Sequence, residues 1–211
     1  MDRCQNFDGE TVVLDIGAGD GSLVYFLKRY MKEAKESSSS SLGNKKNPNT
    51  SKKNKNLPTV IATDDYSWKI DPKAEVEKLS VSDALQKYQP FDENGKRSHQ
   101  LIVICSWQPM GIDWTQQMRD IGVDEYILIG ESDDGNCGDN WLTFGNPEFR
   151  DDIHLSEEES KQMEASVIPP YKRDGFVRVD LDDLSKMQYS RFDSSVSSSS
   201  KTISFRRESK K

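Results

Sequence analysis

The residues with the clearest chemical potential are one carboxylate and three glycines in a short stretch, residues 11–23, which reads TVVLDIGAGDGSL. Asp15 lies near the end of an apolar run, and Gly17, Gly19 and Gly21 follow at alternate positions. A glycine turn lets a ligand approach the main chain closely, and a neighbouring carboxylate accepts hydrogen bonds from a cationic group. The stretch therefore predicts a small-molecule site with an acid at its edge.

The segments on both sides of this turn must hold it in place. Apart from Asp15, residues 12–16 are apolar and mostly β-branched, which is typical of a strand buried on both faces. From Ser22 to about Lys35, apolar residues recur at helical spacing. Strand, glycine turn and helix together are the opening of a nucleotide-binding βαβ unit.

The spacing of the glycines separates two classes of cofactor. The dinucleotide motif is G-x-G-x-x-G, whereas the third glycine here, Gly21, comes one residue early. Asp15 would repel a pyrophosphate but suits an ammonium group. S-adenosylmethionine carries an ammonium group and a sulfonium and has no phosphate. The pattern favours this cofactor over a nicotinamide dinucleotide; a glycine turn that merely joins a strand to a helix is the third interpretation.

The sequence D-I-G-A-G-D-G resembles the first motif of the class I S-adenosylmethionine-dependent methyltransferases. The order of the elements expected over residues 11–206 is also similar to that family's fold. The resemblance implies an α/β protein with a Rossmann-like open sheet of about seven mostly parallel strands and a C-terminal antiparallel hairpin. It implies an enzyme whose cofactor is S-adenosylmethionine. The residues implied to hold the methionine portion of that cofactor are Asp15, Gly17, Ala18, Gly19 and Gly21.

The resemblance also implies an acid at the end of the second strand that binds the ribose hydroxyls. Val60–Ala62 is expected to form that strand, and Asp64 follows it more directly than Asp65. Discounting the Ser/Asn/Lys-rich insertion at 37–57 leaves 22 residues between Gly21 and Asp64. A ribose-binding acid usually follows the glycine loop by about 20 residues. Asp64 is therefore the first choice and Asp65 the second.

A short third strand within Val76–Val81 and a helix at Asp83–Tyr88 are expected next. An N-cap at Asp71, followed by proline, is the alternative for the first of these segments. Asp83 and Ala84 resemble the family position whose carboxylate contacts the adenine amino group. A helix N-cap explains Asp83 equally well.

The rest of the chain is expected to complete one domain, 1–211. Elements with clear patterns are, in order, a strand at Leu101–Cys105, a helix at Asp113–Ile121 closed by Gly122, and a strand at Tyr126–Ile129. Segment 132–175 has no strong strand pattern and contains a helix capped by Ser156. Gln188–Phe192 and Thr202–Phe205 alternate, which predicts an antiparallel hairpin with a serine-rich loop at about 194–200.

Residues after the fourth and fifth strands are the candidates for the acceptor site, because ligands of open α/β sheets lie at the carboxyl ends of the strands. Trp107 either stacks on a planar substrate or packs under the sheet edge. Asp113 is either a base or a helix N-cap. The candidate catalytic residues are Gln108, Asp113 and Glu131. The candidate substrate-binding residues are Ser106, Trp107, Asp133 and Trp141.

Acidic and apolar side chains follow the fifth strand. Glu131, Asp133 and Asp134 would either form a base or a cation site, or belong to plain turns. An apolar wall over the substrate is expected from Trp141, Leu142, Phe144 and Pro147. Only ten residues precede the first strand, so segment 132–175 is expected to act as the lid unless the chain starts late. The amino-methyltransferase signature of Asp or Asn, two prolines and an aromatic residue is not met by Ser106–Pro109, which disfavours DNA bases and glutamine amides as acceptors.

Charge and composition limit the partners and the compartment. The whole chain has a net charge of −7, but without 37–57 and 194–211 there remain 19 basic and 35 acidic residues, a net charge of about −16. Such a body repels phosphate backbones, so a nucleic-acid partner is not expected. His99, His154 and the three cysteines show no metal-ligand or disulfide spacing, so no metal site is predicted.

No membrane span or secretory signal is expected, since no apolar run approaches about 18 residues. We expect a cytoplasmic protein, with the nucleus as the alternative because the lysine run resembles a weak localisation signal. The leading hypothesis is a methyltransferase with an acceptor of unknown class, a protein or a small amine. The alternatives are a methyltransferase-like binding or regulatory subunit and a nicotinamide-dependent oxidoreductase.

Overall fold

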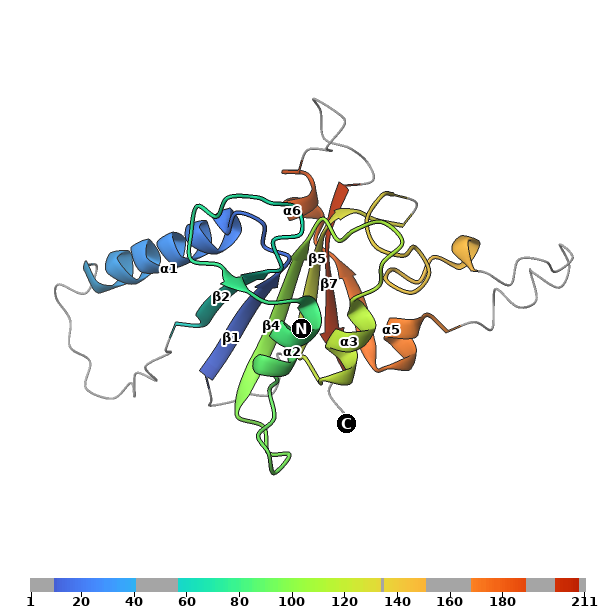
Figure 1. The fold of residues 1–211 in the computed structure, drawn as a ribbon, viewed down its shortest axis with the longest axis horizontal. Helices are drawn as coiled ribbons and strands as arrows, with labels where there is room; N and C mark the ends of the chain where they lie inside the picture. The colour runs from blue at the N-terminus through green and yellow to red at the C-terminus, as the bar shows by residue number, and fades with distance from the viewer. Residues whose placement is uncertain (1–9, 41–56, 134, 151–167, 189–199, 209–211) are drawn as a thin grey trace, which may run out of the picture.

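The computed structural model of the protein describes residues 10–40, 57–133, 135–150, 168–188 and 200–208. Its centre is a seven-stranded sheet with the strand order β3-β2-β1-β4-β5-β7-β6 (Figure 1). The strands are β1 (Glu10–Ile16), β2 (Thr59–Asp64), β3 (Glu77–Lys78), β4 (His99–Ser106), β5 (Glu125–Glu131), β6 (Phe176–Asp180) and β7 (Ser200–Arg207). The expected fold class is confirmed: the open α/β sheet is mostly parallel, and only β7 runs against both of its neighbours.

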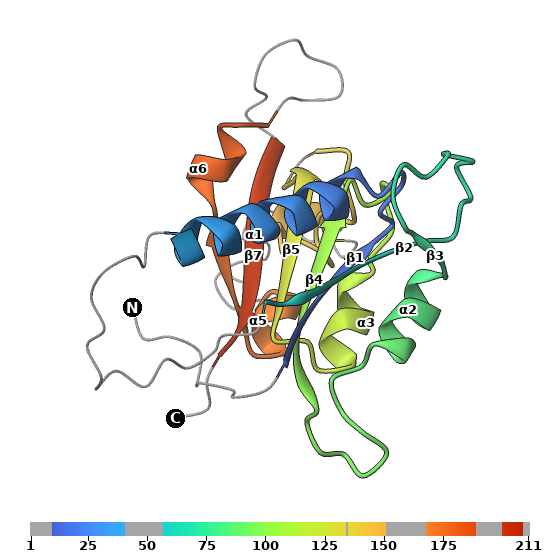
Figure 2. The same ribbon diagram turned by 90° about the vertical axis from the view of Figure 1, so that its left-hand side faces the viewer.

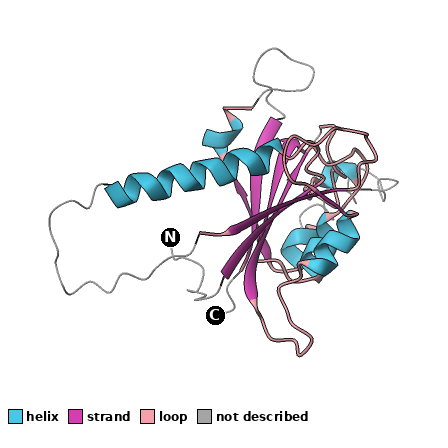
Figure 3. Cartoon of the chain, turned by 60° about the vertical axis from the view of Figure 1, so that its left-hand side comes forward, coloured by secondary structure: helices cyan, strands magenta, loops and turns pink. Residues whose placement is uncertain are grey.

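Helices cover both faces of the sheet. They are α1 (Ser22–Ser40), α2 (Val81–Lys87), α3 (Thr115–Asp120), the 3₁₀ helix η1 (Pro147–Phe149), α5 (Pro170–Arg173) and α6 (Asp182–Ser185). Figure 2 shows α1 crossing in front of the sheet, and Figure 3 shows α2 and α3 on the opposite side from α1. Two apolar layers therefore sandwich the strands, as the continuous apolar runs of β1 and β4 require.

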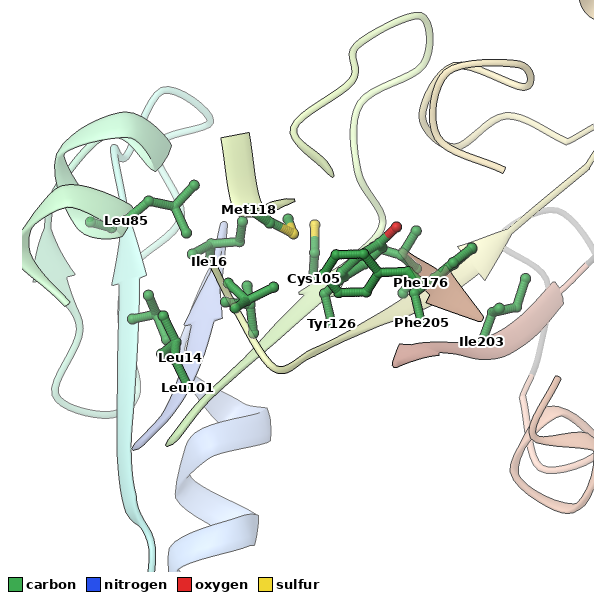
Figure 4. Close-up of a cluster of buried hydrophobic side chains, with 14 of the residues drawn as sticks. Leu14, Ile16, Leu85, Leu101, Cys105, Met118, Tyr126, Phe176, Ile203 and Phe205 are labelled. Atoms are coloured by element: carbon green, nitrogen blue, oxygen red, sulfur yellow. The ribbon is translucent and has the colours of Figure 1, made fainter. Parts of the chain in front are cut away.

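The larger core lies between the sheet and α2 and α3 (Figure 4). Leu14 and Ile16 of β1 point into it, and Tyr126 of β5 stacks on Phe205 of β7 with ring centroids 4.7 Å apart. On the other face, Val24 of α1 packs on Val60 and Ala62 of β2 in a smaller cluster. These two clusters fix the strands whose carboxyl ends carry the predicted site.

Parallel pairing brings those carboxyl ends to one edge of the sheet. Asp15 pairs with Ala62 of β2 on one side and with Ile104 of β4 on the other. The glycine turn after β1, the acids after β2 and the tryptophan-containing loop after β4 consequently begin at the same edge (Figure 1). This is where ligands of open α/β sheets bind.

The predicted strand Gln188–Phe192 lies, except for Gln188, outside the described residues. The strand that pairs with β7 is Phe176–Asp180, with Phe176 opposite Arg207 and Asp180 opposite Ile203. An edge strand needs few apolar residues, and the sequence FVRVD of β6 mixes them with charges, so its pattern is weak. The predicted cap Ser156 also lies outside the described residues.

Element boundaries differ in smaller ways. Helix α1 continues to Ser40, past the expected end near Lys35, and α3 is shorter than Asp113–Ile121. The third strand is confirmed within 76–81, but only two residues pair, and Asp71 starts no helix. Helix α2 begins at Val81 rather than Asp83, because the hydroxyl of Ser80 caps it by accepting the N–H of Asp83 at 3.2 Å.

Candidate functional site

The glycine turn between β1 and α1 adopts a conformation that few other residues allow. Gly17, Gly19 and Gly21 have φ angles of 63°, 57° and 74°, the left-handed region that favours glycine. A Cβ at Gly21 would lie 2.7 Å from Cγ2 of Val76, so a side chain has no room there. Asp20 accepts the N–H of Ser22 at 2.9 Å and so caps the start of α1.

Asp64 connects the turn to the loop after β2. One carboxylate oxygen accepts the main-chain N–H of Gly19 at 2.9 Å, and the other accepts that of Tyr66 at 2.6 Å. A carboxylate has about four acceptor sites, so two remain for a ligand such as a vicinal diol. Asp65 is exposed and accepts the N–H of Ser67. Asp64 thus has the geometry that the ribose-binding position needs.

A cavity of about 420 Å³ lies over these groups. It falls in the range of about 300–1,000 Å³ that small-molecule sites occupy. Its lining residues come from the ends of β1, β2 and β4 and from the loops that follow them: Gly17, Ala18, Gly19, Asp20, Asp64, Asp65, Ser67, Trp68, Ile70, Leu79, Val81, Ser106, Trp107, Pro109 and Trp114. Three of them are carboxylates, and among the described lining residues none is a lysine, arginine or histidine.

Asp15 is buried next to this cavity without lining it. Its side chain is 1% exposed, and its Oδ1 has no hydrogen-bond partner among the described residues. Burial, together with the smaller effect of the negative charge of Asp64, raises the pKa of this carboxyl to about 7. An unpaired buried carboxyl is costly, so a cationic ligand or a bridging water would relieve it.

The predicted adenine contact lies away from the cavity. Asp83 accepts the hydroxyl of Ser80 at 2.6 Å in the first turn of α2, and Ala84 is fully buried in the core. The same segment reaches the cavity instead through two apolar side chains, Leu79 and Val81.

Ser106 and Trp107 line the cavity at the end of β4. Trp107 has a φ of 57°, which is uncommon for a bulky residue, and its N–H donates to the carbonyl oxygen of Ile129 at 2.7 Å. Tyr66 and Lys69, at φ 59° and 51°, lie in the β2–β3 loop and are adjacent in sequence to residues that line the same cavity. Backbone strain of this kind is concentrated at functional sites.

The three candidate catalytic residues all make hydrogen bonds that stabilise the surrounding loops. Gln108 is buried, its Nε2 donates to the carbonyl oxygen of Ile112, and it does not line the cavity. Asp113 accepts the N–H and the hydroxyl of Thr115 at 2.9 and 2.6 Å and the hydroxyl of Thr143 at 3.0 Å. Asp113 therefore has a structural role at the start of α3, although the N-cap position itself is Trp114, whose side chain makes no capping bond. Glu131 is 5% exposed and accepts the amide Nδ2 of Asn136 at 2.7 Å.

Asp133 does not contribute to an acidic rim. Its two carboxylate oxygens accept a bidentate pair from Arg178 at 2.6 and 3.0 Å, and Nζ of Lys201 lies 2.6 Å away. Burial alone would raise its pKa, but the bonds from Arg178 and Lys201 outweigh burial and hold the pKa at about 2. The expected base or cation site at Asp133 is therefore replaced by a closed ion-pair network. Asp134 lies outside the described residues.

None of the described residues of the segment after β5 lines the cavity, so the expected wall is not formed by Trp141, Leu142, Phe144 and Pro147. Phe144 belongs to the core, and Trp141 lies beneath the guanidinium of Arg150, 5.4 Å from its ring centre. Leu142 and Pro147 do not line the cavity either. The apolar walls are instead Trp68, Ile70, Trp107, Pro109 and Trp114. Sequence reasoning missed Trp68 and Ile70, although an aromatic residue four positions after Asp64 was an available signal.

The loop after β5 supports the site indirectly, through contacts with the β4–α3 loop. The N–H of Gly111 donates to the carbonyl oxygen of Gly138 at 2.8 Å, and the N–H of Gly138 donates to that of Gln108 at 3.2 Å. Together with the bond from Thr143 to Asp113, these contacts fasten the β4–α3 loop to the loop after β5. The second loop therefore positions Trp107 and Trp114 without touching the cavity itself.

Comparisons with protein-family models, curated proteins and solved structures found no match to this chain. Within the described ranges, no cluster of three or more His, Cys, Asp or Glu side chains could hold a metal ion. A search of the helices in the same ranges found none with the length and apolar character needed to cross a membrane. The functional argument therefore depends on the cavity and its chemistry.

Proposed function

We propose that this protein binds S-adenosylmethionine and transfers its methyl group. The observation that carries the proposal is the composition of the cavity, which joins a glycine turn and carboxylates but has no basic side chain among its described lining residues. A dinucleotide brings a pyrophosphate, which such a surface would repel. A ligand with an ammonium group, a sulfonium, a ribose diol and no phosphate suits it.

The residues present suit the separate parts of this cofactor. The free lone pairs of Asp64 would accept the ribose hydroxyls, and Leu79 and Val81 offer apolar surface for the adenine ring. The unpaired carboxyl of Asp15 would receive the positive charge of the amino-acid end, directly or through water. When bound, the cofactor supplies an electrophilic methyl group. The chain supplies orientation, which is a large part of the rate gain in such a transfer.

Calorimetry and thermal unfolding test the cofactor assignment. We expect S-adenosylmethionine to bind and to raise the melting temperature, and a nicotinamide dinucleotide to do neither. Asp64→Ala should weaken binding at least tenfold, because it removes the ribose acceptor and loosens the turn. Asp183→Ala is the matched control, since this acid is exposed on α6 outside the cavity. Equal affinity in the wild type and Asp64→Ala, or stabilisation by the dinucleotide alone, would contradict the proposal.

A binding or regulatory role without transfer is the second candidate. It is favoured by the structural engagement of Gln108, Asp113 and Glu131, which leaves no described base where the β4–α3 loop lines the cavity. Incubation of cell extract with labelled S-adenosylmethionine separates the two functions. A methylated product that disappears with Asp64→Ala supports transfer, whereas binding without any product supports the regulatory role.

A further inference from the structure

The cavity has two chemically different ends. Its carboxylates belong to the loop after β1 (Asp20), the end of β2 (Asp64) and the loop after β2 (Asp65). The end formed by the β4–α3 loop is lined by Ser106, Trp107, Pro109 and Trp114 and contributes no acid, imidazole, thiol or amine from the described residues. The cofactor proposed above would occupy the acidic end, so the tryptophan end is where an acceptor would meet the methyl group.

The tryptophan end lies directly beside the glycine turn. A Cβ placed on Gly17 would be 3.4 Å from Cζ3 of Trp114, so the indole ring is in contact distance of the turn. Trp114 is held there by Asp113, which fastens the start of α3 to Thr143. Trp107 is held by its strained backbone and by the bond to Ile129. The main-chain positions that carry both indoles are therefore fixed before any acceptor arrives.

We infer, on the basis of the proposed function, that the acceptor is an amine nitrogen used as its free base, and that the indoles of Trp107 and Trp114 stabilise the cation that it becomes. The nitrogen lone pair forms the new N–CH₃ bond while the S–CH₃ bond breaks and returns its electron pair to sulfur. The positive charge passes from sulfur to nitrogen. A tertiary nitrogen then needs no proton removed, and a primary or secondary one releases its proton to water.

This chemistry matches the absence of a described base at the tryptophan end. A hydroxyl acceptor would need a residue to take its proton during attack, and the acids that were candidates for that task are engaged elsewhere. An amine free base needs no such residue. The faces of indole rings attract cations and are used to recognise quaternary ammonium groups. The indole faces would thus favour the positive charge as it moves from the sulfur of the cofactor to the nitrogen of the acceptor.

A pair of probes with the same shape and different charge tests this inference. Choline carries a trimethylammonium group, and 3,3-dimethylbutan-1-ol carries a carbon in place of the nitrogen. Calorimetry would use the full chain saturated with S-adenosylhomocysteine, the neutral product of the cofactor. We expect choline to bind at least tenfold more tightly than the alcohol. Trp107→Leu should remove most of that preference, and Trp107→Phe should retain part of it.

The outcomes separate this inference from the proposed function. Equal binding of the two probes, or tighter binding of the alcohol, would overturn the amine assignment and leave an apolar acceptor site. Failure of the wild type to bind S-adenosylhomocysteine would overturn the proposed function and the inference with it. Unchanged affinity for S-adenosylhomocysteine in Trp107→Leu shows that this variant is folded. If it is not folded, the wild-type preference and Trp107→Phe decide the result.

Discussion

Two carboxylates at the same edge of the sheet, Asp133 and Asp15, have opposite electrostatic environments. Asp133, just past β5, is met by Arg178 from β6 and Lys201 from β7, and its pKa is held at about 2. Asp15, at the end of β1, is almost fully buried and has an oxygen without a described partner, and its pKa rises to about 7. Asp133 is thus neutralised by cationic side chains of the chain, whereas no described cationic side chain pairs with Asp15.

The difference distinguishes a structural charge from one directed at a ligand. Arg178 and Lys201 neutralise Asp133 and join three strands, so the network stabilises the fold around β5–β7. Asp15 opposes folding in the absence of a cation, because its ionised form is desolvated. A protein accepts such a cost chiefly where function requires it. The comparison can be tested by removing each charge in turn.

The largest effect is expected from Asp15→Asn in the ligand-free protein. A carboxyl whose pKa rises from 3.8 to about 7 on folding destabilises the native state progressively as the pH increases through that interval. At 1.36 kcal/mol for each pKa unit, the cost reaches roughly 4 kcal/mol at pH 8 and vanishes near pH 4. We expect the variant to gain up to that amount at pH 8. Urea unfolding at both pH values measures it.

The same variant should lose affinity for S-adenosylmethionine, which makes the stability gain informative. Greater stability combined with weaker binding is the signature of a residue kept for a ligand. A variant that is less stable at pH 8 than the wild type would show that Asp15 is paired in solution and would remove the contrast with Asp133.

Asp133→Ala should have the opposite sign. It leaves Arg178, whose side chain is 18% exposed, without its bidentate partner. Breaking a largely buried ion pair from one side costs about 3–5 kcal/mol, and the partial exposure here places the expected loss near 3 kcal/mol. Thermal unfolding checks the loss. The double variant with Arg178→Met should recover part of the stability. No recovery would indicate that Asp133 acts through its backbone, whose φ of 66° lies in the left-handed region.

The sequence predicted the surroundings of Asp15 better than those of Asp133. Strands β1, β2, β4 and β5 are buried apolar runs, and the candidate site at β1 and β2 could be proposed because Asp15, the glycines and Asp64 are linked by spacing. These signals are local. A backbone conformation such as the positive φ of Gly17 is likewise indicated by the residue type at that position.

The surroundings of Asp133 depend on contacts between residues that are far apart in the sequence. Asp133 meets Arg178 and Lys201 across 45 and 68 residues, so no spacing rule could identify the pair. The edge strand β6 was missed for the same reason, since its pairing is set by β7 rather than by its own pattern. Trp114 was not assigned to the site because only the fold brings this residue, just before α3, against Gly17.

The glycine turn permits a test of intermediate size. Gly21 and Gly111 both have positive φ, but a Cβ at Gly21 would meet Val76 at 2.7 Å, whereas one at Gly111 would meet nothing within 4 Å. Gly111→Ala should cost about 1 kcal/mol from backbone strain alone. Gly21→Ala should cost about 2 kcal/mol or more and should also weaken cofactor binding. Equal losses in urea unfolding would show that the turn yields to the side chain.

The smallest expected effect is the pH dependence of cofactor affinity. If the ionised form of Asp15 receives the cationic end of the ligand, binding needs this carboxyl to lose its proton. With a pKa of about 7, the ionised fraction rises about fivefold between pH 6 and pH 7, and affinity should increase by the same factor, about 1 kcal/mol. Calorimetry in buffers of different ionisation enthalpy would detect the released proton. Asp133, already ionised above pH 4, contributes nothing over this range, and Asp15→Asn should abolish both the increase and the proton release. A wild-type affinity that is flat from pH 6 to pH 7 would place the cation away from Asp15 and assign its binding to Asp64 alone.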